Sequence, residues 1–88
     1  MITNYQRGRN KEYRLKKKYE KLEYIVCRTA GSHSPFDLIC VKNLGFIVDI
    51  KFIQSKPRKF SDKERRKLYE KFRWLNSANT VKVEFLVE

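Results

Sequence analysis

The first regular pattern in the chain is helical. Between residues 5 and 23, Leu15, Tyr19 and Leu22 recur at the spacing of one helix face, which predicts a first helix with those residues turned inward. Glu12 falls three residues before Leu15 and therefore lies on the same inner face. An acidic residue on an otherwise apolar face marks Glu12 as a candidate functional side chain.

Shorter apolar runs follow, separated by residues typical of turns. Val, Ile, Leu and Phe dominate these runs, and Gly, Pro, Ser and Asn dominate the segments between them. The second and third runs are joined by a tight turn at 43–45, which indicates an antiparallel hairpin. Three strands are thus expected at residues 24–28, 36–42 and 46–53.

The last third of the chain predicts a helix and a strand. Ser61 and Glu64 have the spacing of a capping box, so a second helix is expected to begin there and to run to about Leu75. Residues 80–88 have Val81, Val83, Phe85 and Val87 on one side, and this alternation predicts a final strand. The order helix, three strands, helix, strand indicates a single α/β domain over residues 1–88, with a central mixed sheet flanked by helices.

The charge of the chain bears on its binding partner more than on its fold. Twenty-one Lys and Arg oppose ten Asp and Glu, for a net charge of +11 on 88 residues. Such an excess repels itself in a compact state, and a polyanion is its simplest partner, although a solvated Lys-rich surface is the alternative. Two groups of cations stand out, one in the first helix and one directly after the third strand: Arg7, Arg9, Lys11 and Arg14, then Lys56, Arg58 and Lys59.

Several classes of function are excluded or disfavoured. No apolar run approaches the ~20 residues that a membrane span needs, so no membrane partner is expected. Cys27 and Cys40 form no CxxC pair and only one His is present, which rules out a structural zinc site within one chain. We interpret both cysteines as reduced core thiols of an intracellular, cytoplasmic protein. No Gly-rich phosphate loop suggests a nucleotide cofactor.

The third predicted strand carries two charges within apolar surroundings. Asp49 and Lys51 share one face of that strand, and burying them is costly unless they are paired or bound to a ligand. Asp37 lies at the start of the preceding strand, and we expect Asp37 and Asp49 to converge at one end of the sheet. A solvated Asp49–Lys51 pair, a strand-starting Asp37 and a Glu12–Lys16 pair are the structural alternatives.

Converging carboxylates would suit Mg²⁺, which binds carboxylate and carbonyl oxygens and keeps several waters. The expected metal ligands are Asp37, Asp49, the carbonyl of Ile50 and Glu12. Lys51 would orient the attacking water or stabilise charge on a phosphate.

Four segments of the chain resemble archaeal Holliday-junction resolvases. The resemblance covers about residues 5–72, with Asp49 standing where these enzymes more commonly have Glu. The segments are Tyr5-Gln6-Arg7-Gly8 followed by Glu12, Val26-Cys27-Arg28-Thr29-Ala30-Gly31-Ser32, Phe36-Asp37-Leu38-Ile39, and Val48-Asp49-Ile50-Lys51.

The resemblance implies a PD-(D/E)xK nuclease with a restriction-endonuclease-like αβββαβ core, acting as a homodimer on the symmetric strands of a four-way DNA junction. Mg²⁺ would be the cofactor, with Mn²⁺ substituting. The implied catalytic residues are Glu12, Asp37, Asp49, Lys51 and Ser32, the last beside the scissile phosphate. DNA contacts are expected from Arg7, Arg9, Arg28, Lys56, Arg58 and Lys59.

Two alternatives remain open. The segment between Ser32 and Asp37 is shorter than is usual in these resolvases, so a nuclease of the same fold could act instead on flaps, nicks or single strands. A non-catalytic, basic DNA-binding module is the other alternative. We further expect His33 to be an exposed loop residue, and Phe72, Trp74 and Leu75 to lie in the core or at a dimer interface.

Overall fold

The structure, a computed structural model, describes residues 3–29, 35–78 and 81–88. Helix α1 (Asn4–Lys21) begins at a capping box, in which Gln6 N donates to Thr3 Oγ1 at 3.1 Å and Thr3 N donates to Gln6 Oε1 at 2.9 Å. The chain leaves the helix through Glu23, whose φ of 70° allows the sharp turn into the first strand. The predicted first helix is confirmed, with its end two residues earlier than expected.

A five-stranded mixed sheet forms the centre of the fold. Its spatial order is β1-β2-β3-β5-β4, with β3 and β5 parallel and the other neighbours antiparallel. The α/β class and the mixed sheet are confirmed, while the two-residue β4 lies where only a turn was expected. The strands are β1 (Ile25–Arg28), β2 (Leu38–Asn43), β3 (Val48–Gln54), β4 (Ser77–Ala78) and β5 (Val81–Val87).

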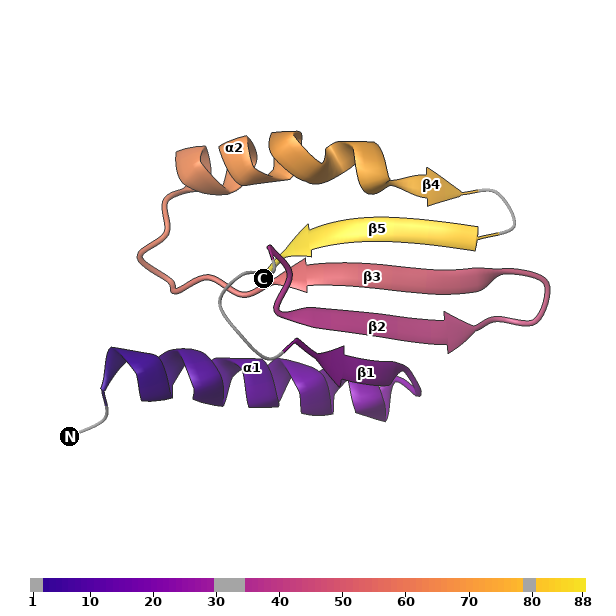
Figure 1. The fold of residues 1–88 in the computed structure, drawn as a ribbon, viewed down its shortest axis with the longest axis horizontal. Coiled ribbons are helices and arrows are strands. Elements are labelled where there is room, and N and C mark those ends of the chain that lie inside the picture. Colours follow the sequence, from indigo (N-terminus) through magenta and orange to yellow (C-terminus); the bar gives the residue numbers. More distant parts are fainter. Residues whose placement is uncertain (1–2, 30–34, 79–80) are drawn as a thin grey trace.

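The two helices lie along opposite borders of this sheet (Figure 1). Helix α1 packs on β1 and β2, whereas α2 (Asp62–Phe72), extended by the 3-10 turn η1 (Arg73–Leu75), packs on β5. One end of the molecule holds the N-terminal ends of α1 and β2 and the C-terminal ends of β3 and β5 (Figure 1). In the described segments, neither helix combines the length and apolar character needed to cross a membrane.

Each helix covers its own apolar cluster. On the α1 side, Leu15 and Tyr19 pack against the fully buried Leu38, Cys40 and Ile53. On the other side four aromatic rings meet with centroids 4.9–5.6 Å apart, and they come from α2, β3, β5 and the segment before β2. These rings belong to Phe36, Phe52, Phe72 and Phe85.

Two apolar residues are not where the sequence pattern placed them. Leu22 is 50% exposed because the helix ends before its face returns to the sheet. Trp74, expected in the core or at a dimer interface, is 74% exposed on η1, so it is not a core residue and its place at an interface stays a prediction. Cys27 is exposed, unlike the buried Cys40, because no helix covers its side of β1. The expectation of two core thiols is therefore wrong for Cys27.

The capping box of α2 is confirmed and provides a prediction. Ser61 Oγ accepts from Glu64 N at 3.2 Å, and Glu64 Oε2 accepts from Ser61 N at 3.2 Å. Ser61→Ala removes one of these bonds and is expected to lower the free energy of unfolding by about 1 kcal/mol. Urea unfolding followed by circular dichroism measures this, and an unchanged midpoint would show that the cap adds nothing.

Candidate active site at the start of strand β2

The register of the β2–β3 hairpin separates the two predicted metal ligands. Leu38 pairs with Ile53 and Lys42 pairs with Asp49, so Asp37 and Asp49 lie toward opposite ends of the hairpin. Four positions of strand, about 13 Å, separate Leu38 from Lys42. The expectation that Asp37 and Asp49 converge is therefore wrong.

The reason lies in the short connection between the strands. Leu44 N donates to Ile47 O at 2.8 Å, and Gly45 takes a φ of 103° that favours glycine. This tight turn brings Asn43 opposite Val48, and every later pair follows from that first one. Asp49 comes one residue after Val48 and therefore lies near the turn. Asp37 directly precedes β2 and therefore lies beside the far end of β3.

The residues that lie opposite Asp37 are Gln54 and Ser55. Asp37 N donates to Ile53 O at 2.8 Å, and Asp37 Oδ2 accepts from Ser55 N at 2.7 Å. Thr29 fixes the same segment from the other side, with its N donating to Asp37 O at 3.0 Å. The Asp37 backbone is thus held from both sides, and its carboxylate is held by the backbone N–H of Ser55.

Glu12 of α1 reaches the same end of the sheet. Its Oε1 lies 3.4 Å from Arg28 Nε, with both side chains largely shielded from solvent. Burial and the nearby negative charge of Asp37 raise the pKa of Glu12, while Arg28 acts to lower it. Glu12 and Asp37 therefore lie at the same end of the sheet, close enough for their charges to interact.

We group with these two acids Gln54, which stands opposite Asp37 in the hairpin register, and Lys56, two residues further along the chain, and call the four the Asp37 site: Glu12, Asp37, Gln54 and Lys56. Gln54 Oε1 is buried and has no hydrogen-bond partner within the described residues, which is unusual for a buried polar atom. The backbone of Lys56 is tied to Glu88 O at 2.8 Å, and its Nζ lies 5.4 Å from the centre of the Phe60 ring.

Sequence reasoning placed Lys56 only among the DNA contacts and missed Gln54. The available signal was the triplet Gln54-Ser55-Lys56, which has the same spacing as Asp49-Ile50-Lys51 but offers an amide in place of a carboxylate. Only the hairpin register shows which of the two triplets faces Asp37. Ser32 and His33 lie in residues 30–34, outside the described part of the chain.

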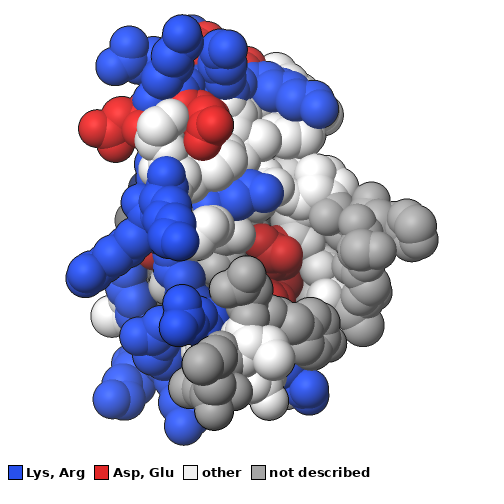
Figure 2. Space-filling model, turned by 90° about the vertical axis from the view of Figure 1, so that its left-hand side faces the viewer, with Lys and Arg blue, Asp and Glu red and all other residues white. Residues whose placement is uncertain are grey.

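Cations from three elements surround this end of the molecule. Burial lowers the pKa of Lys11, and so do the positive charges of Arg65, Arg14 and Arg58, which places α1, α2 and the loop after β3 close together. Figure 2 looks onto this end, where Lys and Arg form most of the charged surface and acidic groups are few.

The predicted DNA contacts differ in how exposed they are to solvent. Arg7, Arg9, Arg58 and Lys59 are exposed, although Arg9 donates to Tyr13 Oη at 3.4 Å. Arg28 is half-buried and engaged with Glu12, so its position suits control of that carboxylate better than direct contact with DNA.

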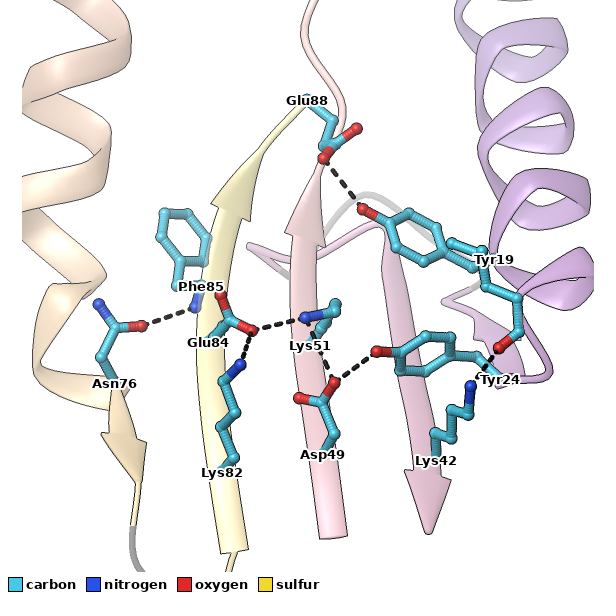
Figure 3. A network of polar contacts seen from close by, with 11 residues as sticks. Tyr19, Tyr24, Lys42, Asp49, Lys51, Asn76, Lys82, Glu84, Phe85 and Glu88 are labelled. Carbon is cyan, nitrogen blue, oxygen red and sulfur yellow. Dashed lines mark hydrogen bonds and ion pairs between the residues drawn. The ribbon is translucent and has the colours of Figure 1, made fainter. Parts of the chain in front are cut away.

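Asp49 and Lys51 belong to a different network, in which they pair with each other and with neighbouring side chains (Figure 3), although Asp49 Oδ1 is buried without a hydrogen-bond partner among the described residues. Tyr24 Oη donates to Asp49 Oδ2, and Lys51 Nζ lies 3.4 Å from the same oxygen. Lys51 Nζ also donates to Glu84 Oε1 at 2.5 Å. Burial acts to lower the pKa of Lys51, but the hydrogen bond to Glu84 and the charge of Asp49 raise it overall.

This network leaves little room for the metal chemistry expected at Asp49. Asp49 is 3% exposed, so a phosphate cannot reach it without rearrangement. Ile50 pairs with Val41 on one side and Val83 on the other, which places its backbone inside the sheet ladder. We therefore interpret Asp49 and Lys51 as a structural pair and Ile50 as a ladder residue.

The donor groups of the Asp37 site fit a hard divalent cation. Mg²⁺ prefers oxygen and is often held by one or two carboxylates plus substrate phosphates and waters. Glu12 and Asp37 supply two carboxylates, and Gln54 supplies an oxygen whose hydrogen-bonding capacity is unused. Among residues 3–29, 35–78 and 81–88, no group of three His, Cys, Asp or Glu side chains has the arrangement of a metal site.

Comparison of the chain with protein-family models, with curated proteins and with solved structures finds no match.

Proposed function

We propose that the chain is a metal-dependent DNA endonuclease of the PD-(D/E)xK type, with a restriction-endonuclease-like core and its active centre at the Asp37 site. The observation that carries this proposal is that Glu12 and Asp37 lie close enough for their charges to interact, and that Asp37 stands opposite Gln54, whose buried side-chain oxygen has no partner among the described residues. The order of helix, hairpin, crossover helix and parallel strand supports the finer fold assignment.

Each residue of the site has a separate task. Asp37, Glu12 and the Gln54 oxygen would hold Mg²⁺, or Mn²⁺ in its place. When bound, the metal supplies Lewis-acid stabilisation of the phosphate and makes a water more acidic. Lys56, on a flexible stem directly after β3, would stabilise the negative charge that develops on the scissile phosphate.

The basic surface around the site would position the DNA backbone. Phosphate contacts from Lys and Arg give affinity without reading sequence, and they suit an enzyme that recognises the shape of its substrate. Exposed cations for this purpose are present on α1 and on the loop after β3, at Arg7, Arg9, Arg58 and Lys59. We propose branched DNA, and the four-way junction in particular, as the substrate.

A panel of labelled substrates tests the proposal. A four-way junction, a matched duplex, a flap and a single strand are each incubated with wild-type protein and Mg²⁺. Paired symmetric nicks on the junction alone support a junction resolvase. Nicks on the flap or the single strand keep the nuclease but reject junction selectivity, and binding without any cleavage would favour a non-catalytic DNA-binding module.

The raised pKa of Glu12 predicts the acid limb of the reaction. A Glu with a raised pKa loses its proton only above the usual value of about 4.3, and because Mg²⁺ would bind the deprotonated carboxylate, cleavage at limiting Mg²⁺ should begin at a correspondingly higher pH. Arg28→Met removes the charge that opposes this shift, and we expect it to move the acid limb further upward. Single-turnover rates against pH at saturating protein measure this, and an acid limb that stays in place would separate Glu12 from the reaction.

A further inference from the structure

The beginning of helix α1 has little apolar anchorage on the sheet. Residues 6–10 are exposed, and Leu15 is the first buried residue among the described side chains of the helix. Glu12, which belongs to the Asp37 site, lies between these two stretches. Polar contacts near Glu12 therefore decide how closely this part of α1 is held to the sheet.

Lys11 makes such a contact, because its ammonium group reaches from α1 to the far ends of two strands. Lys11 Nζ donates to Lys56 O, and it donates to Glu88 O at 3.0 Å. These two hydrogen bonds tie α1 to the segment after β3 and to the residue after β5. Since Glu12 is the next residue of the same helix, the tie also limits how far Glu12 moves from the sheet.

The groups that Lys11 binds are themselves fixed. Glu88 N donates to Gln54 O at 2.8 Å, and Glu88 O accepts from Lys56 N at 2.8 Å. The carboxylate of Glu88 accepts from Tyr19 Oη of α1 at 3.0 Å (Figure 3). Lys56 thus has both of its backbone groups engaged, the N–H by Glu88 and the carbonyl by Lys11.

The surroundings of Lys11 differ from those of a lysine that waits for a phosphate in solvent. Burial and the positive charges of Arg65, Arg14 and Arg58 lower the pKa of Lys11, and the charge of Glu88 opposes this shift. An ammonium group has three donors, and Lys11 directs its hydrogen bonds to backbone carbonyls of the protein. Its position is therefore that of an internal tie.

We propose that Lys11 is a positioning residue of the Asp37 site, which holds Glu12 on α1 and Lys56 after β3 in a fixed mutual position without contacting the metal or the DNA. This inference rests on the proposed nuclease function. A displacement of ~1 Å in a catalytic group can slow a reaction ~100-fold, so a tie between the two elements that carry the site controls the rate.

Lys11→Met tests the proposal, because it keeps an unbranched side chain of similar length and removes the donors. At a temperature where the variant is folded, single-turnover cleavage of the four-way junction at saturating protein should slow ~10- to 100-fold. Lys11→Arg restores donors and should recover most of the rate. If Lys11→Met does not fold, Lys11→Gln, which keeps an amide donor, replaces it with the same expected result.

Lys17→Met is the matched control. It removes the same charge from an exposed position of the same helix, and it should cleave at the wild-type rate. The salt dependence of junction binding in Ca²⁺ then separates positioning from DNA contact. Loss of a phosphate contact would reduce the slope of log affinity against log salt by about one, whereas we expect Lys11→Met to leave the slope unchanged. A reduced slope with an unchanged cleavage rate would overturn the proposal.

Mn²⁺ binding without DNA, followed by electron paramagnetic resonance, gives a readout that needs no cleavage. The Mn²⁺ that wild type binds and Asp37→Asn does not defines the site, and its affinity should fall ~10-fold in Lys11→Met. A wild type that binds Mn²⁺ but cleaves no DNA would reject the nuclease, while the fall in affinity would still support positioning. Wild-type cleavage and Mn²⁺ affinity in Lys11→Met would overturn positioning alone, and a wild type that neither binds nor cleaves would overturn both.

Discussion

Asp37→Asn is expected to reduce metal-dependent DNA cleavage by about a thousandfold, because it removes a carboxylate from the centre where the metal and the phosphate would meet. Binding of the DNA should persist or strengthen, since a negative charge facing the phosphates is lost. Single-turnover cleavage and a binding titration in Ca²⁺ measure the two effects separately.

Asp49→Asn is the control for this prediction. It changes the same functional group in the next strand, but Asp49 lies in the network with Tyr24 and Lys51 and not in the Asp37 site. We expect its cleavage rate to stay within about threefold of wild type at temperatures where it remains folded. The reverse result, with Asp49→Asn inactive and Asp37→Asn active, would return the catalytic role to the Asp49-Ile50-Lys51 triplet.

The second large effect concerns stability. Asp49→Ala removes a 3% exposed carboxylate and leaves the Tyr24 hydroxyl and one side of the Lys51 ammonium without their partner. Because Lys51 keeps its ion pair with Glu84, the loss of stability should be at the lower end of the range for a broken buried ion pair. We expect the free energy of unfolding to fall by about 3 kcal/mol. For a domain of this size that corresponds to a fall of roughly 10–20 °C in Tm.

Chemical denaturation of Asp49→Ala beside Glu70→Ala gives the comparison. Glu70 forms an ion pair with Arg73 at 3.1 Å on the open surface of α2, and such pairs contribute less than about 1 kcal/mol. Equal, small losses in the two variants would mean that the Asp49 network contributes no more than a surface pair.

Acid should weaken the same network. The hydrogen bond from Lys51 lowers the pKa of Glu84, so this pair stabilises the fold above the ordinary Glu value of about 4.3. That contribution is lost as the pH falls through the lowered pKa, when Glu84 takes up a proton. The network therefore supports the fold across the neutral range in which a nuclease would work.

The order of the main helices and strands follows closely from local pattern. Leu15 and Tyr19 recur at helical spacing and are buried on α1, and Ser61 with Glu64 forms the capping box that begins α2. Phe85 lies on the apolar side of the alternating last strand and is buried. These features depend on residues that are close together along the chain, which is why they can be predicted from the sequence.

The pairing across the hairpin could not be predicted in the same way. The Asp49-Ile50-Lys51 triplet has the residue types of a nuclease motif, and Gln54-Ser55-Lys56 does not, but the turn at Gly45 decides which of them lies opposite Asp37. A register is a non-local property, set by turn geometry and by side-chain packing on both faces. The exposure of Cys27 was missed for a related reason, because it depends on where α2 lies over the sheet.

Cleavage of a labelled four-way junction by the wild-type chain, in Mg²⁺ and in EDTA, is the measurement that tests the nuclease proposal most directly. The Asp37 site predicts nicking of the junction in Mg²⁺, with none in EDTA and recovery when Mn²⁺ is added. An equal rate of nicking in Mg²⁺ and in EDTA, or tight binding with no nicking in either metal, would contradict a metal-dependent nuclease at the Asp37 site.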